Sequence, residues 1–155
     1  MKPIIVLHET LSTAADTIAA IQNPSNTFSY HVVITRLGEL VYLVPANQLA
    51  RGAANSAFNG EQVNNSVDSF AYHIALESPL DVVESEDSHS GYTESQYMSL
   101  AWLCSKTGID LNRITTHKEV DLAKVSKDPR SFNRVKFEKT FNSFPKTKYI
   151  MFGIE

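Results

Sequence analysis

The sequence feature that most constrains the fold is the apolar run IIVL at residues 4–7, which leads directly into His8. Three of its four residues are β-branched, and a short apolar run of this kind predicts a buried β-strand over residues 3–8. Two interpretations of His8 are open at this point. It is either a core histidine whose ring nitrogens bond to neighbours, or a metal ligand at the mouth of a site.

Further strand and helix patterns alternate along the chain. In order, they predict a helix from Ser12 or Thr13 to about Ile21, a hairpin over 29–45 that turns at Gly38, a long irregular connection over 46–67 with one helical turn, a strand over 69–77, a helix that Thr93 and Gln96 open as a capping box and Gly108 ends, a strand over 113–120 and a helix around 133–142. In the 69–77 strand, Phe70 and Tyr72 fall on one face, and His73 and Ala75 on the other. We therefore expect one α/β domain over residues 1–155, with a central mixed β-sheet flanked by helices.

The composition argues against several classes of protein. The 155 residues are 43% hydrophobic, and a net charge of −3 without a basic stripe argues against a nucleic-acid partner. Cys104 is the only cysteine, so no internal disulfide can form, and its place on an apolar helix stripe predicts a core residue. No stretch approaches the roughly 20 apolar residues of a membrane span, and the N-terminal run is too short for a signal peptide. We expect cytoplasmic synthesis without a signal peptide, and no membrane insertion.

Two histidines and one aspartate form a candidate metal set. His8 and His117 both lie on short β-rich segments beside loops, and Asp128 follows in the loop after His117. Two imidazoles and a carboxylate are a common set for catalytic zinc, because three protein ligands leave a fourth position for water. The chain has no H-E-x-x-H motif and no C-x-x-C pair, so the spacing alone also fits structural histidines and a loop-capping aspartate.

Six segments follow one another in a characteristic order: IIVLHET, SYHVVITRLGELVYLVP, ARGAANSAFNG, AYHIALE, YTESQYMSLAWLCSKTGI and ITTHKEVDLAKVSKDPRSF. From residue 3 to about 137, the chain resembles the zinc-dependent N-acetylmuramoyl-L-alanine amidases of the type 2 family, which includes phage amidase lysozymes and peptidoglycan recognition proteins. The resemblance implies that His8, His117 and Asp128 hold Zn²⁺. It also implies hydrolysis of the amide between the lactyl group of N-acetylmuramic acid and the L-alanine of the stem peptide.

The chain departs from the family pattern at the catalytic acid. Many members carry a glutamate where this chain has Ala75, and Glu77 is the acid that remains on the same strand. Members without that glutamate use a tyrosine from a YH strand, which corresponds to Tyr30 here. We expect Tyr30 to be catalytic, with Glu77 as the alternative; otherwise they are a strand aromatic and a solvated acid. His73 occupies a glycine position of the family pattern, and either assists the site or packs as a strand histidine.

A second departure concerns the positive charge that stabilises the oxyanion. The family usually has Lys-x-Asp or Lys-x-Cys, whereas this chain has Ser126-Lys127-Asp128, with the lysine one residue late. We expect the flexible Lys127 to reach the site, with Lys124 or the hydroxyl of Ser126 as the alternatives.

The connection over 46–67 predicts a binding loop, since irregular segments of this length in compact domains often bind ligands. Its candidate substrate-binding residues are Arg51, Asn55, Ser56 and Asn64. Their polar groups suit a sugar–peptide substrate, and Arg51 could pair with a stem-peptide carboxylate. An ordered, inert surface loop is the alternative.

Three functions remain open. The first is an active, monomeric amidase that acts on peptidoglycan or muropeptides, and the complete ligand set favours it. The second is a non-catalytic peptidoglycan-binding module. The third is a zinc amide hydrolase, such as a toxin or effector, with a different peptide substrate. A phage lysin and a recycling enzyme both lack signal peptides, so the site of action, in the cytosol or at the cell wall after release, stays open.

Overall fold

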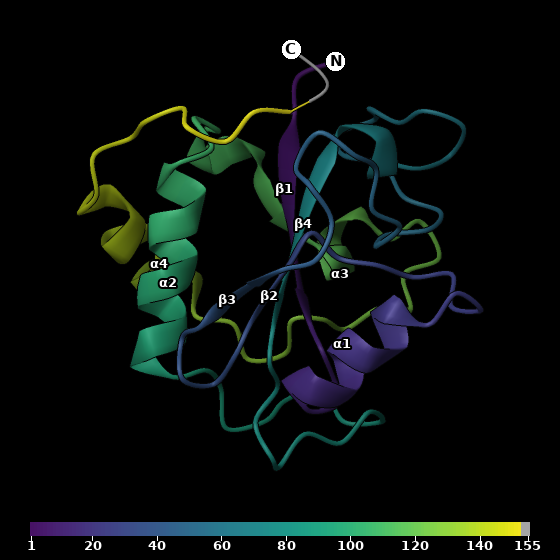
Figure 1. Cartoon of the computed structure of the whole chain (residues 1–155), viewed down its shortest axis with the longest axis vertical. Coiled ribbons are helices and arrows are strands. Elements are labelled where there is room, and N and C mark those ends of the chain that lie inside the picture. The colour runs from purple at the N-terminus through teal and green to yellow at the C-terminus, as the bar shows by residue number, and fades with distance from the viewer. Residues whose placement is uncertain (153–155) are drawn as a thin grey trace.

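A five-stranded mixed β-sheet forms the centre of the computed structural model, which describes residues 1–152 (Figure 1). In the order in which they lie in the sheet, the strands are β3 (Leu40–Tyr42), β2 (Val32–Ile34), β4 (Ala71–Leu76), β1 (Ile4–Glu9) and β5 (Ile114–Thr116). β1 pairs in parallel with both β4 and β5, and β2 pairs in parallel with β4. β3 runs antiparallel to β2 as the second arm of the predicted hairpin. The predicted α/β class and mixed sheet are confirmed.

Helices cover both faces of the sheet. They are α1 (Ala14–Gln22), α2 (Glu94–Ser105), α3 (His117–Val120) and α4 (Arg134–Asn142), with short 3₁₀ helices at Asp68–Phe70 and Leu111–Arg113. α2 and α4 lie together on one side of the sheet, and α1 and α3 lie on the other (Figure 1). Among the described residues, no helix has the length and apolar character needed to cross a bilayer.

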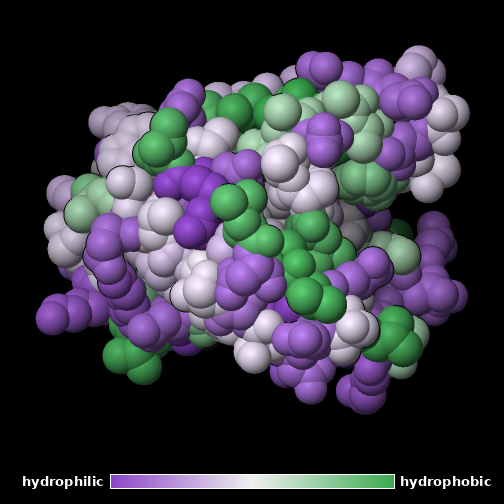
Figure 2. Space-filling view, turned by 90° about the horizontal axis from the view of Figure 1, so that it is seen from below, coloured by the Kyte–Doolittle hydropathy of each residue, from purple (hydrophilic) through white to green (hydrophobic). Residues whose placement is uncertain are grey.

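The apolar residues of β1 are buried on both faces of the sheet. Ile5 and Leu7 pack in the large core under α2 and α4, whereas Ile4 and Val6 pack in a second cluster with the 46–67 connection. The alternation of side chains along a strand therefore turns His8 toward the second cluster and Glu9 toward the first. Seen from the end where β1 finishes, the surface is mainly hydrophilic, with apolar residues in small groups (Figure 2).

The sequence predicted α2 closely. The Thr93 side chain accepts a hydrogen bond from the Gln96 backbone and the Gln96 side chain accepts one from the Thr93 backbone, so the capping box is present. The apolar stripe, including Cys104, is buried in the large core. Gly108 adopts a φ of 72°, a left-handed conformation that favours glycine after the helix.

Three local predictions were wrong. The strand predicted over 113–120 ends at Thr116, because the Thr116 side chain caps α3 and makes His117 the first residue of a helix. The 46–67 connection forms turns and isolated bridges without the expected helical turn. Phe70 ends a 3₁₀ helix before β4, so it packs in the second cluster and not with Tyr72.

Glu77 joins three elements just after β4. Its two carboxylate oxygens accept hydrogen bonds from the backbone N–H groups of Ala14, at the start of α1, and Arg36, after β2, each at 2.7 Å. Its carbonyl oxygen accepts a bond from the side chain of Gln96 in α2 at 3.0 Å. Glu77 is therefore a structural connector between α1, the β2–β3 hairpin and α2.

Replacing Glu77 with alanine should lower the free energy of unfolding by about 2–4 kcal/mol, because two partly buried N–H groups lose a charged acceptor. Glu77→Gln keeps one acceptor oxygen and should lose about half as much. Chemical denaturation of the three proteins measures both differences. An unchanged free energy of unfolding for Glu77→Ala would show that water satisfies both N–H groups equally well.

Candidate metal centre

His8, His117 and Asp128 meet at the carboxyl end of β1, although they are far apart in the sequence. His8 belongs to β1, His117 begins α3 directly after β5, and Asp128 lies in the loop that follows α3. Oδ1 of Asp128 lies 3.0 Å from Nδ1 of His117, and Oδ2 lies 3.3 Å from Nδ1 of His8. One possible ligand atom from each residue lies within 4.8 Å of the other two. The structure thus brings the three predicted ligands together.

The chemistry of this cluster fits a bound zinc ion. Nδ1 of His8 is buried and forms no hydrogen bond with the residues that the structure describes. In a tetrahedral zinc site with metal–ligand distances of about 2.0–2.1 Å, neighbouring ligand atoms lie roughly 3.3 Å apart. Oδ2 of Asp128 lies 3.3 Å from Nδ1 of His8 and 3.3 Å from Nδ1 of His117, which agrees with that spacing. An unpartnered imidazole nitrogen, a second imidazole and a carboxylate therefore form a suitable ligand set for zinc.

Burial and the carboxylate set the protonation of the cluster. Burial lowers the pKa of His8 to about 4, so its ring is neutral at physiological pH. Burial would raise the pKa of Asp128, but its contacts with His117 and His8 outweigh this and hold the pKa below its usual range. Burial would lower the pKa of His117, but the hydrogen bond to Asp128 and its charge raise the pKa above 6.5. Of the three groups, His117 therefore keeps its proton to the highest pH, and a metal must displace this proton first as the pH falls.

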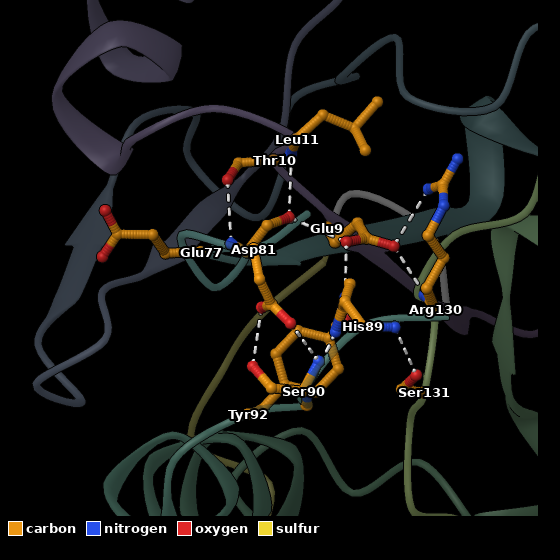
Figure 3. Close-up of polar contacts among 12 residues, drawn as sticks. Glu9, Thr10, Leu11, Glu77, Asp81, His89, Ser90, Tyr92, Arg130 and Ser131 are labelled. Carbon is orange, nitrogen blue, oxygen red and sulfur yellow. Dashed lines mark hydrogen bonds and ion pairs between the residues drawn. The ribbon is translucent and has the colours of Figure 1, made fainter. Parts of the chain in front are cut away.

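Glu9, next to His8, holds the loop that carries Asp128. Its buried carboxylate accepts bonds from the backbone N–H of Arg130 and, at 3.1 Å, from the Arg130 guanidinium (Figure 3). It also accepts a bond from the Ser78 hydroxyl at 2.8 Å and contacts His89 Nε2 at 2.9 Å. Removing one partner of a buried ion pair typically costs about 3–5 kcal/mol, because it leaves the other charge uncompensated. Glu9 therefore fixes the chain two residues beyond Asp128.

A chain of hydrogen bonds runs behind His8. Nε2 of His8 lies 2.8 Å from Nδ1 of His73, and Nε2 of His73 lies 2.8 Å from Oδ1 of Asp68. All three side chains are on the face of the sheet that the 46–67 connection covers. His73 therefore contacts the predicted ligand His8 directly. This contact agrees with the interpretation that His73 assists the site.

Tyr30 lies beside the cluster. The centroid of its ring is 4.7 Å from that of His8, and its hydroxyl forms no hydrogen bond with any of residues 1–152. Burial, together with the charges of Asp128 and Glu9, raises the pKa of Tyr30 above its usual value. At neutral pH the side chain is therefore a neutral phenol that can donate a hydrogen bond. Its catalytic role stays a prediction.

The predicted oxyanion donors occupy different positions. The ammonium of Lys127 donates to the carbonyl oxygen of Ser85 at 2.9 Å and pairs with Asp87 at 3.0 Å, so it is engaged by the acidic 80–91 loop. Lys124 is exposed. Only Ser126 contacts the cluster among these three, with its hydroxyl 3.3 Å from Nε2 of His117. Ser126 therefore lies behind the His117 ring, on the side away from Asp128, and Lys127 is engaged by the 80–91 loop.

Glu77 is similarly engaged away from the cluster. Both of its carboxylate oxygens accept backbone hydrogen bonds, and its side chain extends away from Glu9 (Figure 3). These bonds correct the expectation of a free acid at the site, because a base needs an unoccupied oxygen that faces the reacting atoms.

The 46–67 connection lines a cavity of about 600 Å³. Arg51, Asn55 and Asn64 are in its wall, and all three are exposed. Ser56 is not: it is fully buried, donates to the carbonyl of Ala54 and accepts from the backbone of Val67. Ser56 therefore stabilises the loop from inside, and three of the four predicted residues can reach a ligand.

Sequence reasoning did not identify Asp68 or Glu9 as parts of this centre. Asp68 precedes β4 in a segment without periodicity, and Glu9 is simply the polar end of a strand. The one signal was His73 at a glycine position of the family pattern, since a buried histidine requires hydrogen-bond partners.

A mostly parallel sheet with two imidazoles and a carboxylate at the carboxyl ends of its strands is typical of metal-dependent hydrolases. The model of the N-acetylmuramoyl-L-alanine amidase family matches residues 3–131. The chain therefore belongs to the type 2 branch of this family. Its enzyme class is N-acetylmuramoyl-L-alanine amidase.

Solved structures of amidases share the fold. A selenomethionine derivative of AmpD is 24% identical, with 90% of this chain and 85% of that chain covered and a TM-score of 0.72. AmiD from E. coli, solved with the substrate anhydro-N-acetylmuramic acid-L-Ala-D-gamma-Glu-L-Lys, is 18% identical over 90% of this chain and 57% of its own, with a TM-score of 0.73. LysC from Clostridium intestinale is 22% identical over 91% and 85%, with a TM-score of 0.59. Among curated proteins, no match is found.

Zinc affinity should fall as the pH is lowered, and His117 should determine where the fall begins. The pKa of His117 lies above 6.5 and that of His8 is about 4, so between these values zinc must displace one proton, from His117. The apparent affinity should therefore drop about tenfold per pH unit in this range, as one displaced proton requires, and more steeply below it.

Competition with a chelator across this range measures the slope. Two protons displaced per zinc would show that His8 is protonated as well. His117→Ala should bind less than one equivalent of zinc, and a full equivalent would remove His117 from the ligand set.

Proposed function

We propose that this chain is a zinc-dependent hydrolase that cleaves the amide between N-acetylmuramic acid and L-alanine in peptidoglycan or muropeptides. The observation that carries the proposal is the buried Nδ1 of His8, which forms no hydrogen bond within residues 1–152 and faces Asp128 and His117. Membership of the amidase family supports the bond, and the muropeptide in the AmiD structure supports the substrate class.

In this proposal His8, His117 and Asp128 hold the metal. When bound, zinc supplies Lewis acidity that activates water and polarises the scissile carbonyl. Asp128 lowers the net charge of the site. Because all three ligands come from one chain, we infer that a monomer suffices.

Tyr30 takes the role that the missing glutamate leaves open. Its phenol stays protonated and can donate a hydrogen bond to the carbonyl oxygen as negative charge develops there. The Ser126 hydroxyl contacts Nε2 of His117, the ring nitrogen away from Asp128, so it can orient this ring. Lys127 could add a positive charge only after it leaves Asp87 and Ser85.

We assign the cavity beside the 46–67 connection to the substrate groove, with this connection as one wall. Arg51 is exposed there and can pair with a stem-peptide carboxylate, and the amides of Asn55 and Asn64 can bond to sugar or peptide groups. Arg51 in this wall supports a substrate that carries a carboxylate.

Mass spectrometry of purified muropeptides tests the proposed reaction. The protein should release a stem peptide that begins with L-alanine and a sugar that keeps its lactyl carboxylate, and a chelator should stop the release until zinc is restored. Peptidoglycan that binds but stays intact would indicate a binding module. Cleavage of other amides only would indicate a different peptide substrate, and activity unaffected by the chelator would exclude zinc dependence.

Tyr30→Phe should retain fold and zinc but lose most of its turnover. Loss of one donor to a developing oxyanion typically lowers kcat by ~10²–10³, or roughly 3–4 kcal/mol, with little change in KM. Glu77→Gln is the matched control and should lose less than about tenfold, because Glu77 bonds to backbone groups away from the cluster. If Glu77→Gln lost more than Tyr30→Phe, the glutamate would be the working base and Tyr30 a strand aromatic.

A further inference from the structure

The two ring nitrogens of His8 have very different surroundings. Nδ1 faces Asp128 and His117, whereas Nε2 lies 2.8 Å from Nδ1 of His73. Only one of the two nitrogens carries the proton in a neutral imidazole, and only the bare one can bind a metal. Whatever decides the position of this proton therefore decides whether His8 can be a ligand.

Asp68 determines the direction of the hydrogen bonds behind His8. An ionised carboxylate only accepts, so Nε2 of His73, 2.8 Å from Oδ1 of Asp68, must carry a proton. Nδ1 of a neutral His73 is then an acceptor, and Nε2 of His8 must donate to it. This leaves Nδ1 of His8 bare, and it is this nitrogen of His8 that forms no hydrogen bond in the described part of the chain.

The surroundings of His73 keep this chain of bonds in one arrangement. The backbone N–H of Ala53 donates to the same Oδ1 of Asp68 at 3.1 Å, which orients the carboxylate. The backbone N–H of His73 donates to Nδ1 of His31 at 2.9 Å. Gly52 lies directly against the ring, since a Cβ at position 52 would be 2.6 Å from Nδ1 of His73. The ring of His73 therefore has little room to turn.

We propose that Asp68 and His73 are positioning residues that hold the proton of His8 on Nε2 and thereby present its bare Nδ1 to the metal. Partners of this kind behind a ligating histidine orient the ring, and their loss typically weakens metal binding about 10–100-fold. Neither residue touches the reacting atoms. The inference rests on the proposed metal centre.

The position of the proton can be read directly in the metal-free full-length chain. Long-range proton–nitrogen correlation spectra of histidine-labelled protein at neutral pH distinguish the two tautomers, and His8→Ala and His73→Leu assign the signals. Both His8 and His73 should carry their single proton on Nε2. A proton on Nδ1 of His8, or two protons on His73, would overturn the proposal. Because neither metal nor substrate is present, this result is independent of the proposed activity.

Zinc affinity, measured by chelator competition at constant pH, provides the second test. His73→Leu should bind zinc about 10–100-fold more weakly. Tyr72→Leu is the matched control, since it removes a buried ring of the same strand that packs in the large core on the opposite face of the sheet, and it should stay within about threefold. Equal losses in the two variants, or no loss in His73→Leu, would overturn the proposal.

A variant of Asp68 separates the hydrogen bond from the charge. In Asp68→Asn the Ala53 N–H holds the side-chain oxygen in place, so His73 keeps its acceptor. This variant should retain the His8 tautomer and bind zinc within about threefold of the unmodified chain, whereas Asp68→Leu should resemble His73→Leu. Affinity lost equally in both Asp68 variants would contradict a role through the hydrogen bond.

Discussion

At the end of β1, the alternation of side chains along a strand sends His8 to one face of the sheet and Glu9 to the other. His8 lies next to Asp128, and Glu9 binds Arg130, two residues further along the same loop. Consecutive residues of one central strand thus contact the loop that carries Asp128 from both sides. Because β1 is hydrogen-bonded to β4 and β5, the position of this loop depends on the most buried part of the sheet.

The acidic 80–91 loop is part of the same arrangement. Arg130 donates to the carbonyl oxygens of Glu84 and Glu86, each at 2.7 Å, and Lys127 pairs with Asp87. The acidic side chains of this loop are exposed. Its backbone carbonyl groups, however, accept hydrogen bonds from Arg130 and so hold the loop that carries Asp128. The contact also explains why Lys127 does not face the cluster.

The departures from the family pattern form a consistent set. Ala75 removes the usual acid, and Ser126 replaces the usual lysine, so the groups that remain near the cluster are the neutral hydroxyls of Tyr30 and Ser126. A neutral phenol and a hydroxyl can donate hydrogen bonds but cannot act as a base at neutral pH. His73 and Asp68 lie behind the His8 ring, on the side away from Asp128 and His117.

The sequence by itself predicted most of the elements and the candidate ligand set. Apolar runs, the capping box at Thr93 and the turn glycines act over a few residues, so β1, α2 and the hairpin could be predicted from local patterns. The ordered family segments indicated His8, His117 and Asp128, and the structure brings these three together.

Only the tertiary structure decided what the other polar groups do. Glu77 is engaged by the backbones of Ala14 and Arg36, Lys127 by Asp87, and Asp68 by His73. A sequence shows that a carboxylate or an ammonium is present, but the side chain bonds to whichever buried donor or acceptor the folded chain places within about 3 Å. For Glu77 and Lys127 those partners come from distant segments, so only the packing of those segments assigns their roles.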